Sequence, residues 1–165
     1  MSEKKTDIFE AIEIALDAEQ KSKKFYLDAI EKVSNEQGKN LLQQLANFEQ
    51  KHYDKLYELK TSLKEKGEFV EYEGTEITSY KVKSSIEFAG EIEPNMNDVL
   101  EILGLAIRAE NNAYEHYRKI AKDTTNLKGK KMFLKLGKEE LSHRRILSDE
   151  FYQLSFGSRR WFWGN

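Results

Sequence analysis

Apolar side chains recur along this chain at alternating spacings of three and four residues, the pattern of one face of an α-helix. Between residues 42 and 63 leucines fill this face, but Glu49 and His52 replace them at two successive positions. An unpaired carboxylate is costly to bury, whereas a carboxylate and an imidazole one turn apart can bind the same cation. The pattern therefore predicts a long helix that carries a Glu-x-x-His pair on its core face.

The Glu-x-x-His pattern occurs a second time, at Glu140 and His143, again among apolar residues. Each of these residues follows its counterpart by 91 positions (140 − 49 = 91 and 143 − 52 = 91). Six further residues recur unchanged at this offset: Asp7, Glu10, Ala15, Ala18, Glu19 and Tyr26 correspond to Asp98, Glu101, Ala106, Ala109, Glu110 and Tyr117. This self-similarity predicts a tandem repeat of one helical hairpin.

Four helices are predicted from the periodicity and from capping signals. The first helix is expected from Ile8 to about Val33, after a capping box of Asp7 and Glu10, and the second from the capping signal of Ser34 and Gln37 to about Lys64. The third is expected to begin after Asn97 or Asp98, with Asp98 and Glu101 as its capping box. The fourth is expected to follow Asn126 and to end near Leu154. The fold class expected is all-α: a four-helix bundle of two repeated antiparallel hairpins joined by a long crossover, spanning residues 1–154.

The core glutamates of each hairpin are equally far from its turn. Glu19 and Glu49 lie fifteen residues on either side of Ser34 (34 − 19 = 49 − 34 = 15), a height of about 22 Å at the helical rise per residue. Glu110 and Glu140 flank Thr125 in the same way. Six side chains are therefore predicted to meet at mid-bundle as metal ligands: Glu19, Glu49, His52, Glu110, Glu140 and His143.

Residues 65–97 join the two hairpins and contain glycines, the only proline and two short alternating stretches, around Tyr80 and Ile86. Helices of roughly thirty residues are about 45 Å long, and a connection of this length can run back along them. The second and third helices are therefore expected to be parallel, which places a pseudo-twofold axis through the polar centre. The remaining residues, 155–165, form an aromatic and basic tail, expected to pack over the bundle end or on a partner subunit, with a docking peptide as the alternative.

Composition narrows the function classes. A net charge of −2 and a pI of about 6.0 provide no general attraction to nucleic acid or to anionic membranes. No stretch has the apolar length of a membrane span, and the N-terminus does not resemble a signal peptide, so a cytoplasmic location is expected. The absence of cysteine excludes disulfides, thiolate zinc sites, iron–sulfur clusters and thiol nucleophiles within these residues.

Four carboxylates against two imidazoles leave an excess of negative charge that cations would offset. Oxygen-rich donors with two imidazoles suit iron, or manganese, better than zinc, so two such ions are expected. Glu49 and Glu140 are expected to bridge the ions, with Glu19 and Glu110 as terminal ligands. The alternative is a structural cluster of ion pairs without metal.

Tyr26 and Tyr117 lie two turns beyond Glu19 and Glu110 on the same helix faces. A phenol at this position can donate a hydrogen bond to a ligand carboxylate, although it can also be a core aromatic that is satisfied elsewhere. His116 lies off the apolar face and is expected at the surface. Tyr114 is expected in core packing, with a place beside the site as the alternative.

The residues Glu19, Glu49, His52, Glu110, Glu140 and His143 resemble the ligand pattern of the ferritin-like superfamily, and within it the di-iron domain of rubrerythrin, over residues 7 to 153. The resemblance implies an oxidoreductase that reduces hydrogen peroxide or dioxygen. Two departures bear on mechanism: the further glutamate that rubrerythrins usually carry is Ala113 here, and without cysteine no rubredoxin domain can form. An external electron donor such as a separate rubredoxin, and a homodimer or larger oligomer, are therefore expected. The alternatives are iron oxidation and storage, di-manganese catalase, and a structural bundle with an empty site.

Overall fold

A computed structural model describes residues 7–75, 92–157, 159–161 and 163 of the chain. It contains four helices: α1 (Ile8–Ile30), α2 (Glu36–Lys66), α3 (Met96–Asp123) and α4 (Leu127–Phe156). Within these ranges there is no strand, only an isolated bridge between Ile92 and Arg160. The chain is thus an all-α four-helix bundle, which confirms the predicted fold class. The alternating stretches around Tyr80 and Ile86 lie outside the described residues.

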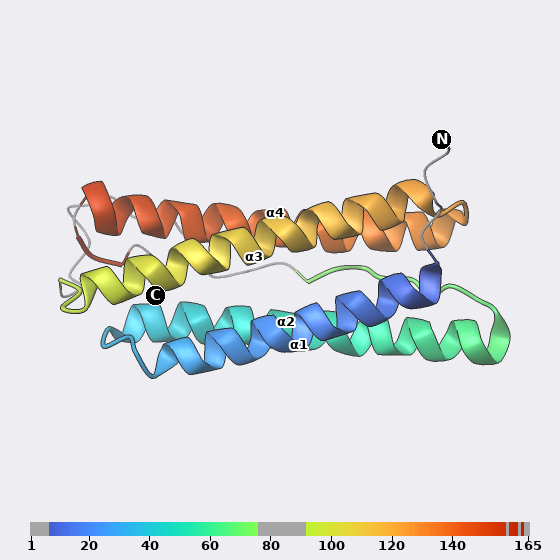
Figure 1. Cartoon of the computed structure of the whole chain (residues 1–165), viewed down its shortest axis with the longest axis horizontal. Coiled ribbons are helices and arrows are strands. Elements are labelled where there is room, and N and C mark those ends of the chain that lie inside the picture. The colour runs from blue at the N-terminus through green and yellow to red at the C-terminus, as the bar shows by residue number, and fades with distance from the viewer. Residues whose placement is uncertain (1–6, 76–91, 158, 162, 164–165) are drawn as a thin grey trace.

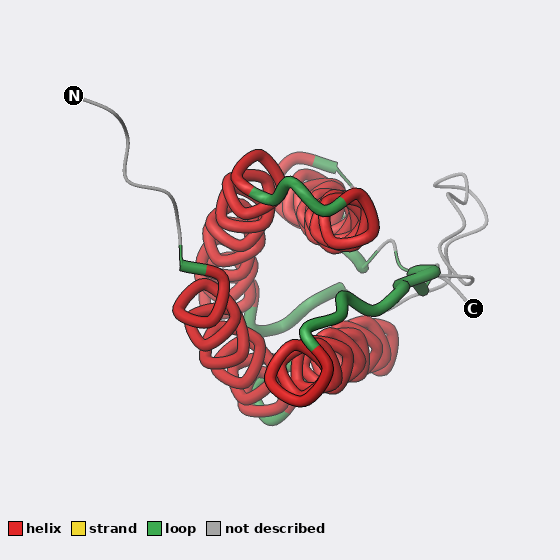
Figure 2. The backbone as a smooth tube through the Cα atoms, turned by 90° about the vertical axis from the view of Figure 1, so that its right-hand side faces the viewer, coloured by secondary structure: helices red, strands yellow, loops and turns green. Residues whose placement is uncertain are grey.

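The helices form two antiparallel hairpins, α1 with α2 and α3 with α4, and α2 and α3 run in the same direction as predicted (Figure 1). Between the hairpins, the closest backbone contacts join α1 and α3. On the opposite side of the bundle, the segment that follows α2, up to residue 75, runs back between α2 and α4 (Figure 2). The described part of the crossover therefore lies on the side of the bundle opposite the contact of α1 with α3.

The limits of the first hairpin differ from prediction at its turn. Asp7 is the N-cap of α1 as predicted, and its Oδ1 accepts a hydrogen bond from the Phe9 N–H at 2.9 Å. The helix ends at Ile30 instead of Val33, because the following N–H groups bond three residues back and tighten the chain. The N-cap of α2 is Asn35 and not Ser34, since the Asn35 Oδ1 accepts from the Gln37 N–H at 2.8 Å.

The capping box predicted for Asp98 and Glu101 is wrong, because α3 begins at Met96 with Asn95 as its N-cap. The Asn95 side chain makes no cap bond; its Nδ2 donates to the Ser34 Oγ at 3.2 Å, a tertiary contact to the turn of the first hairpin. Asp98 instead lies in the first turn, where its charge favours the positive end of the helix dipole. Local sequence identity with Asp7 is thus overridden by a contact between the hairpins.

The second hairpin begins its last helix as predicted and ends it slightly later. Asn126 is the N-cap of α4, and its Oδ1 accepts from the Gly129 N–H at 3.0 Å. The helix continues to Phe156, two residues beyond the predicted Leu154 (156 − 154 = 2). The side chain of Phe156 is 76% exposed, so this added turn is not fixed by burial of its last residue.

The apolar core is divided into two clusters, one toward each end of the bundle. The first includes Leu45, Leu103 and Leu147, and the second includes Leu56 and Phe133. In every helix the residues of the two clusters are separated by the predicted ligand positions. The clusters therefore enclose a polar layer at mid-bundle and exclude solvent from it along the bundle axis.

The C-terminal tail closes the end of the bundle where α2 and α3 begin. Trp161 and Trp163 are buried in the first cluster, as expected for a tail that packs over the bundle end. The Trp161 Nε1 donates to the Glu93 Oε2 at 2.8 Å, which satisfies both buried groups. Gly38 in α2 leaves room for this ring, since a Cβ atom there would lie 2.5 Å from Trp161. Among the described residues, no helix combines the length and apolar character needed to cross a membrane.

Candidate metal centre

All six predicted ligands lie together in the polar layer, with one or two contributed by each helix. None has an exposed fraction above 3%: the six are Glu19, Glu49, His52, Glu110, Glu140 and His143. Charged and polar side chains are buried at this level only when they are paired or coordinate a metal. The structure therefore brings together the whole set that the 91-residue offset predicts.

The six side chains form two groups that share members. In the first group, ligand atoms of Glu19, Glu49, His52 and Glu140 all lie within 4.8 Å of one another. The second group meets the same limit and consists of Glu49, Glu110, Glu140 and His143. Glu49 and Glu140 belong to both groups, so each lies between two adjacent positions for a cation. This is the placement that bridging carboxylates require.

Glu140 faces both histidines through different oxygens. Its Oε1 lies 2.7 Å from the Nδ1 of His52, and its Oε2 lies 3.5 Å from the Nδ1 of His143. The Nδ1 of His52 is 3.4 Å from the Glu19 Oε1, and that of His143 is 3.6 Å from the Glu110 Oε2. The two imidazole rings are stacked, with centroids 6.0 Å apart and an angle of 14° between planes. Both histidines thus present Nδ1 to the centre.

The donor atoms that converge on the centre are not satisfied by hydrogen bonds. Among the described residues, seven buried atoms of the six side chains have no hydrogen-bond partner: Glu19 Oε2, Glu49 Oε1, His52 Nδ1, Glu110 Oε2, both Glu140 oxygens and His143 Nδ1. The short His52–Glu140 approach does not have hydrogen-bond geometry. Buried polar atoms are almost always paired, so this cluster of oxygen and nitrogen atoms without hydrogen-bond partners fits cations with oxygen and imidazole ligands.

The carboxylates repel one another without a cation. Burial and the charge of Glu140 raise the pKa of Glu49 well above its usual range, and the same two causes raise that of Glu110 to about 8. Burial opposes ionisation of Glu140 too, but His52 and its other neighbours hold its pKa well below its usual range. The metal-free cluster therefore keeps protons on some carboxyl groups, and these protons compete with a metal ion.

The neighbouring carboxylates also change the pKa values of the two histidines. Burial opposes the charged form of His143, but Glu110 and Glu140 overcome it and raise its pKa to about 9. Burial also opposes the charged form of His52, but the charges of Glu19 and Glu140 outweigh it and raise the pKa of His52 well above its usual range. Both histidines are thus protonated near neutral pH in the metal-free chain and must release protons when they bind a metal.

Tyr26 and Tyr117 each donate a hydrogen bond to a clustered glutamate, and each bond joins the two hairpins. The Tyr26 hydroxyl of α1 donates to the Glu110 Oε1 of α3 at 2.5 Å, and the Tyr117 hydroxyl of α3 donates to the Glu19 Oε1 of α1. Burial, followed by the charge of the partner carboxylate, raises the pKa of both phenols well above its usual range, so the protons stay on the tyrosines. The two bonds tie the hairpins together and fix the carboxylates of Glu110 and Glu19.

Replacing Tyr117 by phenylalanine is expected to lower the free energy of unfolding of the metal-free chain by about 1–3 kcal/mol, because the buried Glu19 oxygen loses its donor. Chemical denaturation monitored by circular dichroism measures this change. Tyr26→Phe should have a similar effect, since it is the repeat counterpart. Tyr57→Phe is the matched control, because that side chain is 54% exposed. A Tyr117→Phe protein as stable as the control would contradict a structural role of the bond.

Glu139 is a buried residue of the centre that the sequence pattern did not single out. Its Oε2 lies 2.7 Å from the Nε2 of His52, on the side of the ring that faces away from the other ligands. The Tyr72 hydroxyl donates to the same oxygen, and the Thr75 N–H donates to the Glu139 Oε1 at 2.5 Å. The sequence does contain a signal for this residue: at the 91-residue offset Glu139 corresponds to Phe48 (139 − 48 = 91), so a carboxylate replaces an aromatic ring at this position of the repeat.

Three other residues considered from the sequence lie outside the two ligand groups. His116 is partly exposed, as expected for a residue off the apolar face, and its Nε2 lies 3.2 Å from the Ala11 carbonyl oxygen. Tyr114 is partly buried and lies near Gly137 of α4, outside both apolar core clusters. Ala113, at the position of the further rubrerythrin glutamate, packs against the second apolar cluster. No carboxylate therefore stands at that position.

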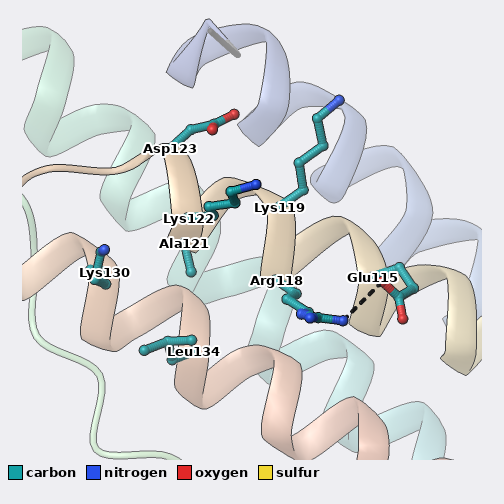
Figure 3. A pocket seen from close by; sticks show the side chains of 8 residues that line it. All are labelled: Glu115, Arg118, Lys119, Ala121, Lys122, Asp123, Lys130 and Leu134. Atoms are coloured by element: carbon teal, nitrogen blue, oxygen red, sulfur yellow. Dashed lines mark ion pairs between the residues drawn. The ribbon is translucent and has the colours of Figure 1, made fainter. Parts of the chain in front are cut away.

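A surface hollow of about 760 Å³ lies along the last turns of α3 and the start of α4, away from all six ligands (Figure 3). Its charged lining is mainly basic, with Arg118, Lys119, Lys122 and Lys130 against Glu115 and Asp123. The Arg118 Nη1 lies 3.8 Å from a Glu115 oxygen, and both side chains are exposed. The buried polar layer, and not this hollow, holds the groups that can bind a metal.

Comparison with known proteins supports the same assignment. The model of the Rubrerythrin family matches residues 1–60, which contain Glu19, Glu49 and His52. No curated protein and no solved structure gives a significant match. The match is consistent with a ferritin-like, rubrerythrin-like protein, and it covers the ligands of the first hairpin. Together with the buried cluster, it points to metal binding, with iron as the metal of the matched family.

Proposed function

We propose that this chain is a non-haem di-iron oxidoreductase that reduces hydrogen peroxide or dioxygen with electrons from an external donor. The observation that carries the proposal is the pair of overlapping ligand groups, each with three carboxylates and one histidine, that share Glu49 and Glu140. Two adjacent positions of this composition suit two iron ions, with manganese as the other metal of matching preference.

The six clustered side chains and the two tyrosines would have different roles in such a centre. Glu19 and His52 would hold one ion and Glu110 and His143 the other, with Glu49 and Glu140 between them. When bound, a ferrous pair supplies two electrons, the number that reduction of one peroxide to two waters consumes. The apolar clusters on both sides exclude bulk water, and Tyr26 and Tyr117 hold protons at phenol oxygens directly on the terminal carboxylates.

Electrons for further turnovers must come from outside these residues. The sequence contains no cysteine, so it provides neither a rubredoxin-type iron site nor a thiol to reduce the centre again. A separate small electron carrier such as rubredoxin is therefore the proposed donor. We further propose a homodimer or a larger homo-oligomer as the functional form.

Anaerobic mixing of the iron-loaded, reduced chain with hydrogen peroxide tests the proposal. Without a reductant, the protein is expected to consume about one peroxide per pair of ferrous ions and then stop, because each iron gives one electron. Addition of a reductase and a rubredoxin should restore continuous consumption. The measurements are peroxide loss and the near-ultraviolet absorption of oxidised iron, with Glu140→Ala as the control that lacks a ligand shared by both positions.

Other results would identify the alternative functions. Continuous peroxide loss with gas evolution and no reductant would overturn the proposal in favour of a catalase, for which manganese should be the better metal. Uptake and oxidation of far more than two irons per chain by a large assembly would favour iron storage. Absence of bound metal in natively purified and in reconstituted protein would leave a structural bundle.

A further inference from the structure

The repeat predicts two equivalent halves of the metal centre, but the structure makes them unequal. The 91-residue offset relates Glu19 to Glu110 and His52 to His143, so each ligand has a counterpart of the same type. Beside these ligands the corresponding residues differ in type, because Glu139 of α4 corresponds to Phe48 of α2. Each of these two residues lies against the histidine of the opposite hairpin.

In one half, Glu139 supports His52. The Glu139 Oε2 lies 2.7 Å from the Nε2 of His52, which leaves the Nδ1 of the same ring directed at Glu19 and Glu140. A carboxylate that accepts from one ring nitrogen selects the tautomer whose other nitrogen is free to bind a metal. The Glu139 side chain is only 10% exposed, so this bond is shielded from competing water.

The crossover holds Glu139 in place. The Tyr72 hydroxyl and the Thr75 N–H both donate to its carboxylate, and both come from the segment that follows α2. Gly74 permits this approach, since its φ is 86° and a Cβ atom there would lie 2.2 Å from Lys135 and 3.0 Å from the Glu139 Oε1. Both donors lie after the end of α2, outside the repeated helices, so the repeat itself does not provide them.

In the other half, an aromatic ring takes the place of the carboxylate. Phe48 lies edge-on to His143, with ring centroids 5.1 Å apart and an angle of 68° between planes. The Lys51 Nζ lies 5.5 Å from the centre of the Phe48 ring, and Phe48 itself is 6% exposed. Phe48 shields His143 from solvent but offers no acceptor for its N–H. The orientation and basicity of His143 therefore receive no carboxylate support from this position.

We propose that the two metal positions are inequivalent and that the position of Glu19 and His52 binds the first ion, with Glu139 as its positioning residue. This inference rests on the proposed function, because it requires two bound ions. Loss of a carboxylate that orients a ligating histidine typically lowers metal affinity about 10–100-fold. The position of Glu110 and His143, for which the described residues show no such carboxylate, is expected to bind its ion more weakly by a factor of the same order.

Titration with Mn²⁺ under equilibrium conditions tests the order of binding without reference to activity. In the unmodified chain, calorimetry is expected to resolve a tighter and a weaker ion. Glu110→Ala removes a ligand of one position only and should keep the tighter ion. Glu19→Ala is its repeat counterpart and should keep the weaker one. Tighter binding in Glu19→Ala than in Glu110→Ala, or equal affinities in the two, would overturn the proposed order.

The Glu110→Ala and Glu19→Ala variants also test the role of Glu139. A glutamine has one acceptor oxygen, so Glu139→Gln cannot accept from both His52 and the Thr75 N–H. Added to Glu110→Ala, this substitution should weaken Mn²⁺ binding about 10–100-fold, and added to Glu19→Ala it should change the affinity little. Phe48→Leu is the matched control at the counterpart position and should not affect the tighter ion. An equal loss in both backgrounds, or a loss in neither, would overturn the role of Glu139.

Gly74→Ala provides a second test that leaves every carboxylate unchanged. The added methyl group and the positive φ should displace the Thr75 N–H from Glu139 and weaken the tighter ion alone. Unchanged affinity in a folded Gly74→Ala protein would contradict support through the crossover. Binding of fewer than two Mn²⁺ ions by the unmodified chain would overturn this inference together with the di-metal function, whereas two ions of equal affinity would overturn the inequivalence alone.

Discussion

Glu140→Ala is expected to abolish the binding of both metal ions, whereas Glu110→Ala is expected to leave one. The reason is that Glu140 belongs to both ligand groups and directs one oxygen toward each histidine, while Glu110 belongs to one group. Metal analysis after reconstitution with Fe²⁺ or Mn²⁺ and gel filtration measures the ratio of metal to chain. Two bound ions in Glu140→Ala would contradict a centre built around this carboxylate.

The same variant should lose the stabilisation that metal provides. An ion that binds only the folded chain adds about 4 kcal/mol when its free concentration is a thousand times its dissociation constant. For a chain of this size, each kcal/mol raises the melting temperature by about 2–4 °C. The unmodified protein should therefore melt at a clearly higher temperature with Mn²⁺, and Glu140→Ala should not respond. Glu58→Ala, at an exposed glutamate of α2, is the control and should respond fully.

The convergence of the six buried side chains was predictable because two independent regularities coincide at their positions. The apolar periodicity fixes which face of each helix points inward, and it leaves Glu49 and Glu140 as polar exceptions on that face. Equal distance from the turn then brings Glu19 to the level of Glu49 and Glu110 to the level of Glu140. Both arguments use only helical geometry, which tertiary contacts do not change. This is why the structure brings the predicted set together without an omission.

The support of His52 was not predictable in the same way. Glu139 is adjacent in sequence to a ligand and reads as part of a charged stretch, and its partners Tyr72 and Thr75 come from a crossover that the repeat does not contain. No periodicity relates that segment to a helix face. The contact of Trp161 with Glu93 joins two further non-repeating segments and was missed for the same reason. Contacts between irregular segments depend on the complete fold.

Helix limits show where local signals stop being sufficient. Asp7 and Asp98 occupy equivalent positions of the repeat, but only Asp7 caps a helix. The difference arises because Asn95 is held by the Ser34 Oγ in the turn of the first hairpin, which starts α3 earlier than its own sequence favours. Similarly, Ser34 and Asn35 are both good N-cap residues, and the choice of Asn35 follows from where α1 ends. Where two neighbouring residues are both good N-cap residues, the packing of the hairpins determines which of them begins the helix.

The metal-free chain is expected to lose stability as the pH rises from about 5 to about 9, and the stabilisation by metal should grow over the same range. Burial and Glu140 raise the pKa of Glu110 from 4.5 to about 8, and the neighbouring carboxylates overcome burial to raise that of His143 from 6.5 to about 9. Both groups bind their protons more tightly when folded, so their contribution is complete below the lower values and is lost as the pH passes the higher ones.

The acid side of this stability maximum should be set by Glu140, whose pKa is lowered in the folded chain despite its burial, chiefly by His52. Its contribution is present above pH 4.5 and is lost as the pH falls below that value, the opposite direction to Glu110. Melting temperatures in chelator at about pH 3, 5, 7 and 9, compared with those in Mn²⁺, measure both trends. Glu110→Gln resembles the protonated carboxyl in shape and should flatten the alkaline loss in chelator. A melting temperature of the metal-free chain that stays constant or rises between pH 5 and pH 9 would contradict the mutual repulsion of the carboxylates.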